Sequence, residues 1–376
     1  MRIIPSLLLL LGWLHLPVEA CQICLPFPVK SLADHLVEAD KVVLARENPE
    51  KPFSLIATEA LKGDGELSAI DLFLDSHSRR VLENDATKGI VCILTQGEWK
   101  RVATSDPILG PIIHEIIAKE PDWEASPDQR PDFFAPYLDH PERQVALLAH
   151  LEVARAPYSK IRTLSDAIPI ERLRAFLGDF RYAEWHALYI LLLAQSDDPG
   201  DRKRIVDSMK SNARFSIVLQ SAAWATAYIE IEESEAIEFL RRDYFDGPNR
   251  RPDEINAILA AFSVHGTNGH THLRDEIVEA YRSLAERHPD QLPAIVKDLT
   301  KWQRWDLADL VLKRLTTSPG TDDLTTTVEL RNYLRLADQV SKETSDPASP
   351  SRQLLWILPA LILLPLAFKL SGFRSA

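Results

Sequence analysis

The sequence predicts an α+β chain in which a small β-barrel head precedes an all-α solenoid and a C-terminal transmembrane helix. Three patterns support this prediction. Short β-branched runs occupy residues 41–103, apolar residues recur at the helical period from 131 to 341, and an apolar stretch covers 354–368. Glycine is scarce, with 13 in 376 residues, and this scarcity favours helices over tight β-hairpins.

Residues 1–20 have the composition of an export signal. Arg2 precedes an apolar run over 3–16, and the segment ends in small residues at Ala20. We expect cleavage after Ala20, which would place the bulk of the chain outside the cytoplasm.

Residues 21–105 are predicted to form the head. The pattern indicates one amphipathic helix, followed by short runs rich in β-branched residues that read as strands. The predicted helix covers 29–38, and the predicted strands cover 41–46, 53–61, 69–74, 89–94 and 99–103. Five short strands suit a small barrel.

The chain has three cysteines, Cys21, Cys24 and Cys92. Thiols outside the cytoplasm usually pair, so we expect a disulfide from Cys92 to Cys24 or, alternatively, to Cys21. One cysteine would then remain outside the disulfide. If Cys24 pairs with Cys92, that cysteine is Cys21, and its lipidation is an option because Val18-Glu19-Ala20-Cys21 is a poor but possible lipobox. A redox-active pair is disfavoured because Cys21 and Cys24 precede every predicted strand.

The head resembles the netrin-like branch of the OB fold, to which the tissue inhibitors of metalloproteinases belong. The similarity lies in the N-terminal cysteine pair, the segments "EADKVVLARE" and "LIATEALKG", and a cysteine on a later strand. It implies an OB-like barrel. Protease inhibition would act through the mature N-terminus at Cys21, but Gln22 and Ile23 depart from the inhibitory tripeptide.

A connecting helix and linker are expected over 106–130, and a HEAT-like solenoid over 131–341. Long apolar helices alternate with shorter, more charged ones, and a spacing of about 35 to 45 residues per pair suits stacked helical repeats. The inner helices are predicted at 142–156, 181–194, 215–231 and 253–264, and the outer helices at 201–210, 233–242 and 274–287. The body resembles uncharacterised bacterial exported proteins in which a cysteine-bearing head precedes helical repeats.

The last part of the chain is predicted to hold it at a membrane. A linker over 342–352 leads to a transmembrane helix over 353–370 and a cytoplasmic tail over 371–376. We expect a single-pass protein of the cell membrane with its bulk in the periplasm. A sorting signal that is cleaved and replaced by another attachment is the alternative.

Two groups of residues are candidates for a site. His265, His270 and His272 lie close enough in sequence to bind a transition metal, although the glycines between them favour an ordinary interhelical turn. Trp302 and Trp305, at an i, i+3 spacing, could form a recognition patch, although core packing is the commoner use of such a pair.

The formal net charge of −12 argues against a nucleic acid partner. The sequence contains no nucleotide-binding, serine hydrolase or zinc-protease motif. We therefore expect no catalysis and no cofactor, and interpret the chain as a scaffold that binds another envelope or extracellular protein. An envelope enzyme or thiol-redox factor is the competing class.

Overall fold

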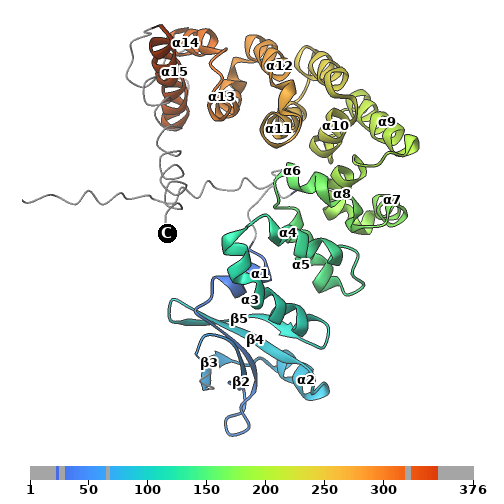
Figure 1. Ribbon diagram of the computed structural model, residues 1–376, viewed down its shortest axis with the longest axis vertical. Helices are drawn as coiled ribbons and strands as arrows, with labels where there is room; N and C mark the ends of the chain where they lie inside the picture. Colours follow the sequence, from blue (N-terminus) through green and yellow to red (C-terminus); the bar gives the residue numbers. More distant parts are fainter. Residues whose placement is uncertain (1–22, 25–29, 65–67, 318–322, 346–376) are drawn as a thin grey trace, which may run out of the picture. The chain divides into compact units, whose positions relative to one another are not determined.

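The computed structural model describes residues 23–24, 30–64, 68–317 and 323–345 (Figure 1). A curled antiparallel sheet of five strands is followed by a long series of helices, which confirms the α+β class. In the part of the chain that is described, no helix is long and apolar enough to cross a membrane. The predicted signal 1–20, Cys21 and the predicted membrane helix 353–370 lie outside the described residues.

The chain divides into two compact units. The first comprises Met1–Glu233 and Asn256–Val264, and the second comprises Ser234–Ile255 and His265–Ala376. The head and the first body helices therefore share one unit. The border falls within α10 (Ser221–Leu240), where Glu233 has a non-helical backbone with φ of 46°.

All five predicted strands of the head are present. They are β1 (Lys41–Glu47), β2 (Ser54–Lys62), β3 (Ala69–Phe73), β4 (Gly89–Thr95) and β5 (Glu98–Ser105), and each pairs antiparallel with its neighbours in the order β3-β2-β1-β4-β5. Helix α1 (Leu32–Val37) precedes them. The sequence did not predict α2 (Ser76–Asn84), whose first turn is capped by the carboxylate of Asp75.

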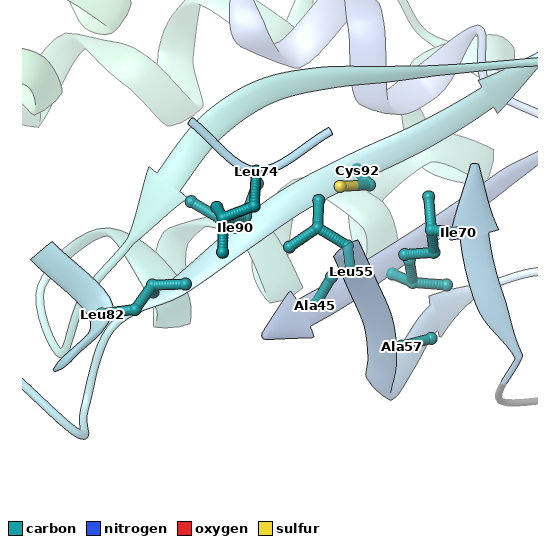
Figure 2. Packing of buried hydrophobic residues seen from close by; sticks show 9 residues of the cluster. Ala45, Leu55, Ala57, Ile70, Leu74, Leu82, Ile90 and Cys92 are labelled. Carbon is teal, nitrogen blue, oxygen red and sulfur yellow. The ribbon is translucent and has the colours of Figure 1, made fainter. Parts of the chain in front are cut away.

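One face of the sheet holds the apolar core of the head (Figure 2). Ile90 and Cys92, two residues apart on β4, both point into it, as the alternation of a strand requires. Helix α2 adds Leu82. The buried members of this cluster are Val43, Ala45, Leu55, Ala57, Ile70, Leu74, Leu82, Ile90 and Cys92.

The expected disulfide to Cys92 is not formed. Cys92 is an unbridged thiol with no exposed surface, and Leu55 and Leu74 of the apolar cluster lie beside it (Figure 2). Its place in the packed core, facing other strand residues, explains why Cys24 does not bridge to it. Cys24 is also buried. Burial raises the pKa of the Cys92 thiol to about 12.

Cys92 should resist alkylation in the native protein. A pKa of about 12 lowers the thiolate fraction roughly a thousandfold at neutral pH, and burial also blocks access. Iodoacetamide labelling followed by peptide mass spectrometry should find Cys92 unmodified in buffer and fully modified in urea. Equal labelling in both conditions, or a Cys92 disulfide in non-reduced digests, would contradict this arrangement.

After the sheet, the helices of the first unit continue with α3 (Leu109–Ala125), which contacts α1 and β2. Short 3₁₀ segments join several of the helices that follow. These helices are α4 (Gln129–Phe134), α5 (Arg143–Val153), α6 (Tyr158–Ile161), α7 (Ile170–Gly178), α8 (His186–Leu193) and α9 (Pro199–Phe215), with parts of α10 (Ser221–Leu240) and α11 (Pro252–Asn268). The predicted helices at 181–194 and 215–231 start later than expected, at His186 and Ser221.

The described part of the second unit contains four further helices, α12 (Arg274–Arg287), α13 (Leu292–Lys301), α14 (Ala308–Thr317) and α15 (Leu324–Ser345). Helices α13 and α14 both contact α15. The predicted helix at 233–242 corresponds to the part of α10 that follows the break at Glu233, and a π-helical turn, Arg241–Phe245, comes after Leu240. The predicted linker begins too early, because α15 runs to Ser345 and Lys342 forms an i, i+4 ion pair with Asp338 within it.

A set of buried charges joins the head to the first body helices; we call it the Asp34 network. Asp34 of α1 accepts from Arg130 of α4 at 2.6 Å and from Arg155 at 2.6 Å. Glu152 of α5 accepts from Arg130 at 2.6 Å and from Arg155 at 3.2 Å, and Ser31 donates to it. Two carboxylates thus face two guanidinium groups, so the network is formally neutral and fully paired.

The Asp34 network should make the protein sensitive to acid. Burial opposes ionisation of Asp34, but the Ser31 amide and the two arginines outweigh it and lower the pKa of the carboxyl. The resulting stabilisation is present above the unfolded-state value near pH 4 and is lost as pH falls through the folded-state pKa.

Urea unfolding of Asp34→Asn should therefore differ most from wild type at pH 7, with the gap narrowing near pH 2. The exposed Asp71→Asn variant should match wild type at both values. A gap of equal size at both pH values would exclude the linkage.

Candidate functional site

A cavity of about 300 Å³ opens in the first unit, between the segment that leads into α5 and the segment that joins α7 to α8. Its walls combine aromatic rings with arginine side chains. The lining residues are Leu138, Asp139, His140, Pro141, Arg143, Ala146, Arg172, Phe176, Arg181, Tyr182, Glu184 and Trp185. We call this cavity the aromatic–arginine pocket.

Three rings form the apolar wall of the pocket. The centroids of Phe176 and Tyr182 lie 4.5 Å apart, and those of Tyr182 and Trp185 lie 5.9 Å apart. Phe176 lies on α7, and Tyr182 and Trp185 lie on a 3₁₀ segment, Phe180–Trp185, capped by Asp179, which accepts from the Arg181 amide at 2.9 Å. The wall is therefore fixed by local hydrogen bonds as well as by packing.

The arginines differ in how firmly they are held. Arg172 donates to both oxygens of Asp139 and lies over the Phe176 ring at 4.9 Å. Arg143 and Arg181 have side chains 83% and 84% exposed. Arg143 has only a distant carboxylate, Glu184 at 3.7 Å. Arg181 donates to both oxygens of Asp179, at 3.1 Å and 2.6 Å. The exposed, loosely paired guanidinium group of Arg143 can turn towards an incoming carboxylate at small cost.

Behind the wall lies a layer of buried polar rings. The His150 ring stacks on Trp185 at 5.1 Å, with 17° between their planes. His150 is 3% exposed, and burial lowers its pKa to about 4, so the imidazole is neutral at physiological pH. Tyr189 packs edge-on to His150 and has a raised pKa for the same reason, its burial. The buried layer of His150 and Tyr189 thus supports the aromatic wall, and the charged arginine side chains lie at the rim of the pocket.

A second cavity, of about 420 Å³, lies in the second unit, and it is more open and predominantly acidic. Its arginines are already paired: Arg241 with Glu238 and Asp246, and Arg304 with Asp275 and Asp306. No aromatic ring lines it; its walls are Ser234, Ile237, Glu238, Arg241, Asp275, Glu276, Glu279 and Arg304. The aromatic–arginine pocket is therefore the better candidate for recognition.

The three candidate histidines do come together in the second unit. The rings of His265 and His270 are stacked with centroids 5.4 Å apart, and His272 lies edge-on to His270 at 5.3 Å. However, the Nδ1 of the buried His265 accepts the His270 amide at 3.4 Å. In neutral imidazole this places the ring hydrogen on Nε2, which disfavours His265 as a metal ligand.

That turn starts later than its glycines suggest. Helix α11 continues through Gly266 to Asn268, and a 3₁₀ segment, Thr271–Leu273, leads into α12. A side chain at Gly269 would contact the His265 imidazole closely. The glycine thus permits the approach of backbone and ring.

The two candidate tryptophans do not share a helix face. Trp302 follows the last residue of α13, and Gln303 has φ of 56°, so the chain turns before Trp305. Trp302 is 7% exposed, stacks on Tyr281 and donates to Thr267. Trp305 packs on Tyr333. Trp302 thus packs in the core while Trp305 is half-buried, and the two do not form a common recognition patch.

Sequence reasoning missed the aromatic–arginine pocket. One signal was available: "FLGDFRYAEW", over 176–185, interleaves aromatic residues with arginine and carboxylates. The partners from 138–146 could be found only from the fold. No family model, curated protein or solved structure matches this chain.

Proposed function

We propose that this chain is a membrane-anchored, extracytoplasmic scaffold that binds another envelope protein through the aromatic–arginine pocket. The observation that supports the proposal is the composition of the cavity, in which Phe176, Tyr182 and Trp185 meet Arg143 and Arg181. Tryptophan, tyrosine and arginine are the residues most enriched among those that contribute binding energy at protein interfaces.

The chemistry of the pocket defines the partner segment. An apolar or aromatic side chain would fill the cavity and displace water from the rings. A neighbouring carboxylate would accept from the rim arginines, which present planar, bidentate donors. The expected partner therefore exposes an aromatic residue next to an acidic one.

The finer architecture belongs to the same proposal. The first and last strands of the sheet, β3 and β5, are in contact, which supports an OB-like barrel. Successive helices of the body support HEAT-like repeats, whose stacked surfaces bind extended segments. Export and anchoring rest on residues 1–20 and 353–370 of the sequence.

The competing functions have less support. A thiol-redox factor needs a reactive thiolate, and burial raises the pKa of Cys92 to about 12. An envelope enzyme also has less support. The buried His150 stacks on an indole, and no hydrogen bond that could orient the imidazole through its Nδ1 occurs among the described residues. Protease inhibition through Cys21 concerns a part of the chain outside the described residues.

Reversing two rim charges should weaken partner binding. Arg143→Glu together with Arg181→Glu should lower affinity about tenfold or more, because an acidic partner would then face like charges. Both side chains are over 80% exposed, so the fold should be unaffected. Fluorescence anisotropy with labelled peptides that pair phenylalanine with aspartate would measure the loss, with lysine-containing peptides as the negative probe.

Arg331→Glu is the matched control, since Arg331 is exposed and lies in the other unit. Affinity capture from envelope fractions with mass spectrometry should recover the same partner with wild type and Arg331→Glu, but not with the double variant. Equal capture by all three proteins, or no preference for acidic over basic peptides, would refute the proposal.

A further inference from the structure

Three large apolar side chains protrude into solvent within five consecutive residues of the first unit. Phe215, the last residue of α9, is 63% exposed, and Ile217 and Leu219, between α9 and α10, are 40% and 68% exposed. Phe180 is 83% exposed, and Gln220 donates to the carbonyl of Ala183 at 3.1 Å, which ties the loop to the Phe180 segment. We call residues 215–219 the apolar loop.

The apolar loop has a fixed backbone. Ser216 adopts a left-handed conformation with φ of 52° and ends α9. The Ile217 amide donates to the Asn212 carbonyl at 3.1 Å, and the Ser221 amide donates to the Val218 carbonyl at 2.9 Å. The buried Asn212 side chain also donates to Ser221. Each backbone group that is bonded within the loop lowers the cost of bringing the loop into an apolar environment.

The charges beside the apolar loop are basic, although the whole chain carries −12. The Arg214 guanidinium lies over the Phe215 ring at 5.2 Å. Lys210, one turn earlier on α9, is exposed, and Arg181 follows Phe180. The nearest acidic groups on these segments, Asp179 and Glu184, have arginine partners.

We propose that the apolar loop inserts into the interface of a lipid bilayer that contains anionic lipids. Its protruding side chains suit insertion between headgroups, where apolar area leaves water, while Arg214 and Lys210 stay at the level of the phosphates. A protein partner would instead need a pocket for each protruding side chain. None of residues 215–219 lines the aromatic–arginine pocket.

The test places a fluorescent reporter on the loop of the full chain. Leu219→Trp adds an indole at an exposed position, so the core is untouched. In vesicles of phosphatidylcholine and phosphatidylglycerol with brominated acyl chains, the added emission, taken as variant minus wild type, should fall about twofold or more. Reporting from the loop itself separates its insertion from lipid binding by other segments.

Leu324→Trp is the matched control, because Leu324 is 81% exposed and lies in the other unit; its emission should not be quenched. Adding Lys210→Glu and Arg214→Glu to Leu219→Trp should reduce quenching, as should raised salt. Emission of the Leu219→Trp indole that is the same in water and with vesicles would overturn the proposal. Equal quenching without phosphatidylglycerol would overturn the preference for anionic lipid.

Discussion

Replacing Arg130 with alanine will lower the free energy of unfolding by about 3 kcal/mol or more, as expected when one partner of a buried ion pair is removed. Arg130 donates to Asp34 and to Glu152, whose side chains are 11% and 3% exposed. Arg155 alone would then face two buried carboxylates. Urea unfolding monitored by circular dichroism would measure the change.

Lys203→Ala is the control for this prediction. Lys203 also forms an ion pair, with Asp207, but both side chains are over half exposed. Its loss should change stability by less than about 0.5 kcal/mol. If Arg130→Ala unfolds at the same urea concentration as Lys203→Ala, the Asp34 network does not hold the head to the helices.

Gly266→Ala will destabilise the second unit by about 1–3 kcal/mol, the usual cost of overpacking. A β-carbon at Gly266 would overlap the indole ring of Trp302. That ring has little freedom to move, because it stacks on Tyr281 at 5.9 Å and donates to Thr267 at 3.0 Å. The change is best measured by thermal unfolding together with the fluorescence of the buried indole.

Gly178→Ala tests whether steric overlap, and not the loss of a helical glycine, is responsible. Gly178 ends α7, and a β-carbon there would meet no atom within 4 Å. Alanine has the higher helix propensity, so this variant should be neutral or slightly more stable. Equal destabilisation by both substitutions would rule out the contact with Trp302 as the cause.

Local patterns predicted the sheet well. The apolar run of β4, at Gly89–Thr95, and the β-branched run of β1 have the length and composition of buried strands, and both formed as expected. Cysteine pairing was not predictable in this way, because it depends on which face of β4 carries Cys92. That face is the apolar core, which the sequence alone does not reveal.

The predicted helix boundaries were wrong where apolar residues are exposed. The run from Phe215 to Ile231 reads as one inner helix, yet its first residues form the apolar loop and α10 starts at Ser221. The left-handed Ser216 and the Asn212 side chain end α9 there. Periodicity detects apolar residues but not whether they are covered, so it missed the loop, as it missed the aromatic–arginine pocket.

The head cannot be transplanted into another protein without the first helices that follow it. A fragment that stopped before Arg130 would carry Ser31 and Asp34 without a guanidinium group to pair with them. The remainder would keep two arginines but only one carboxylate, that of Glu152, and so a net positive charge. The smallest module that recombination or an engineer could move intact therefore extends from Lys30 to Arg155. We expect evolution to keep the head and the first body helices together even where the later helices diverge.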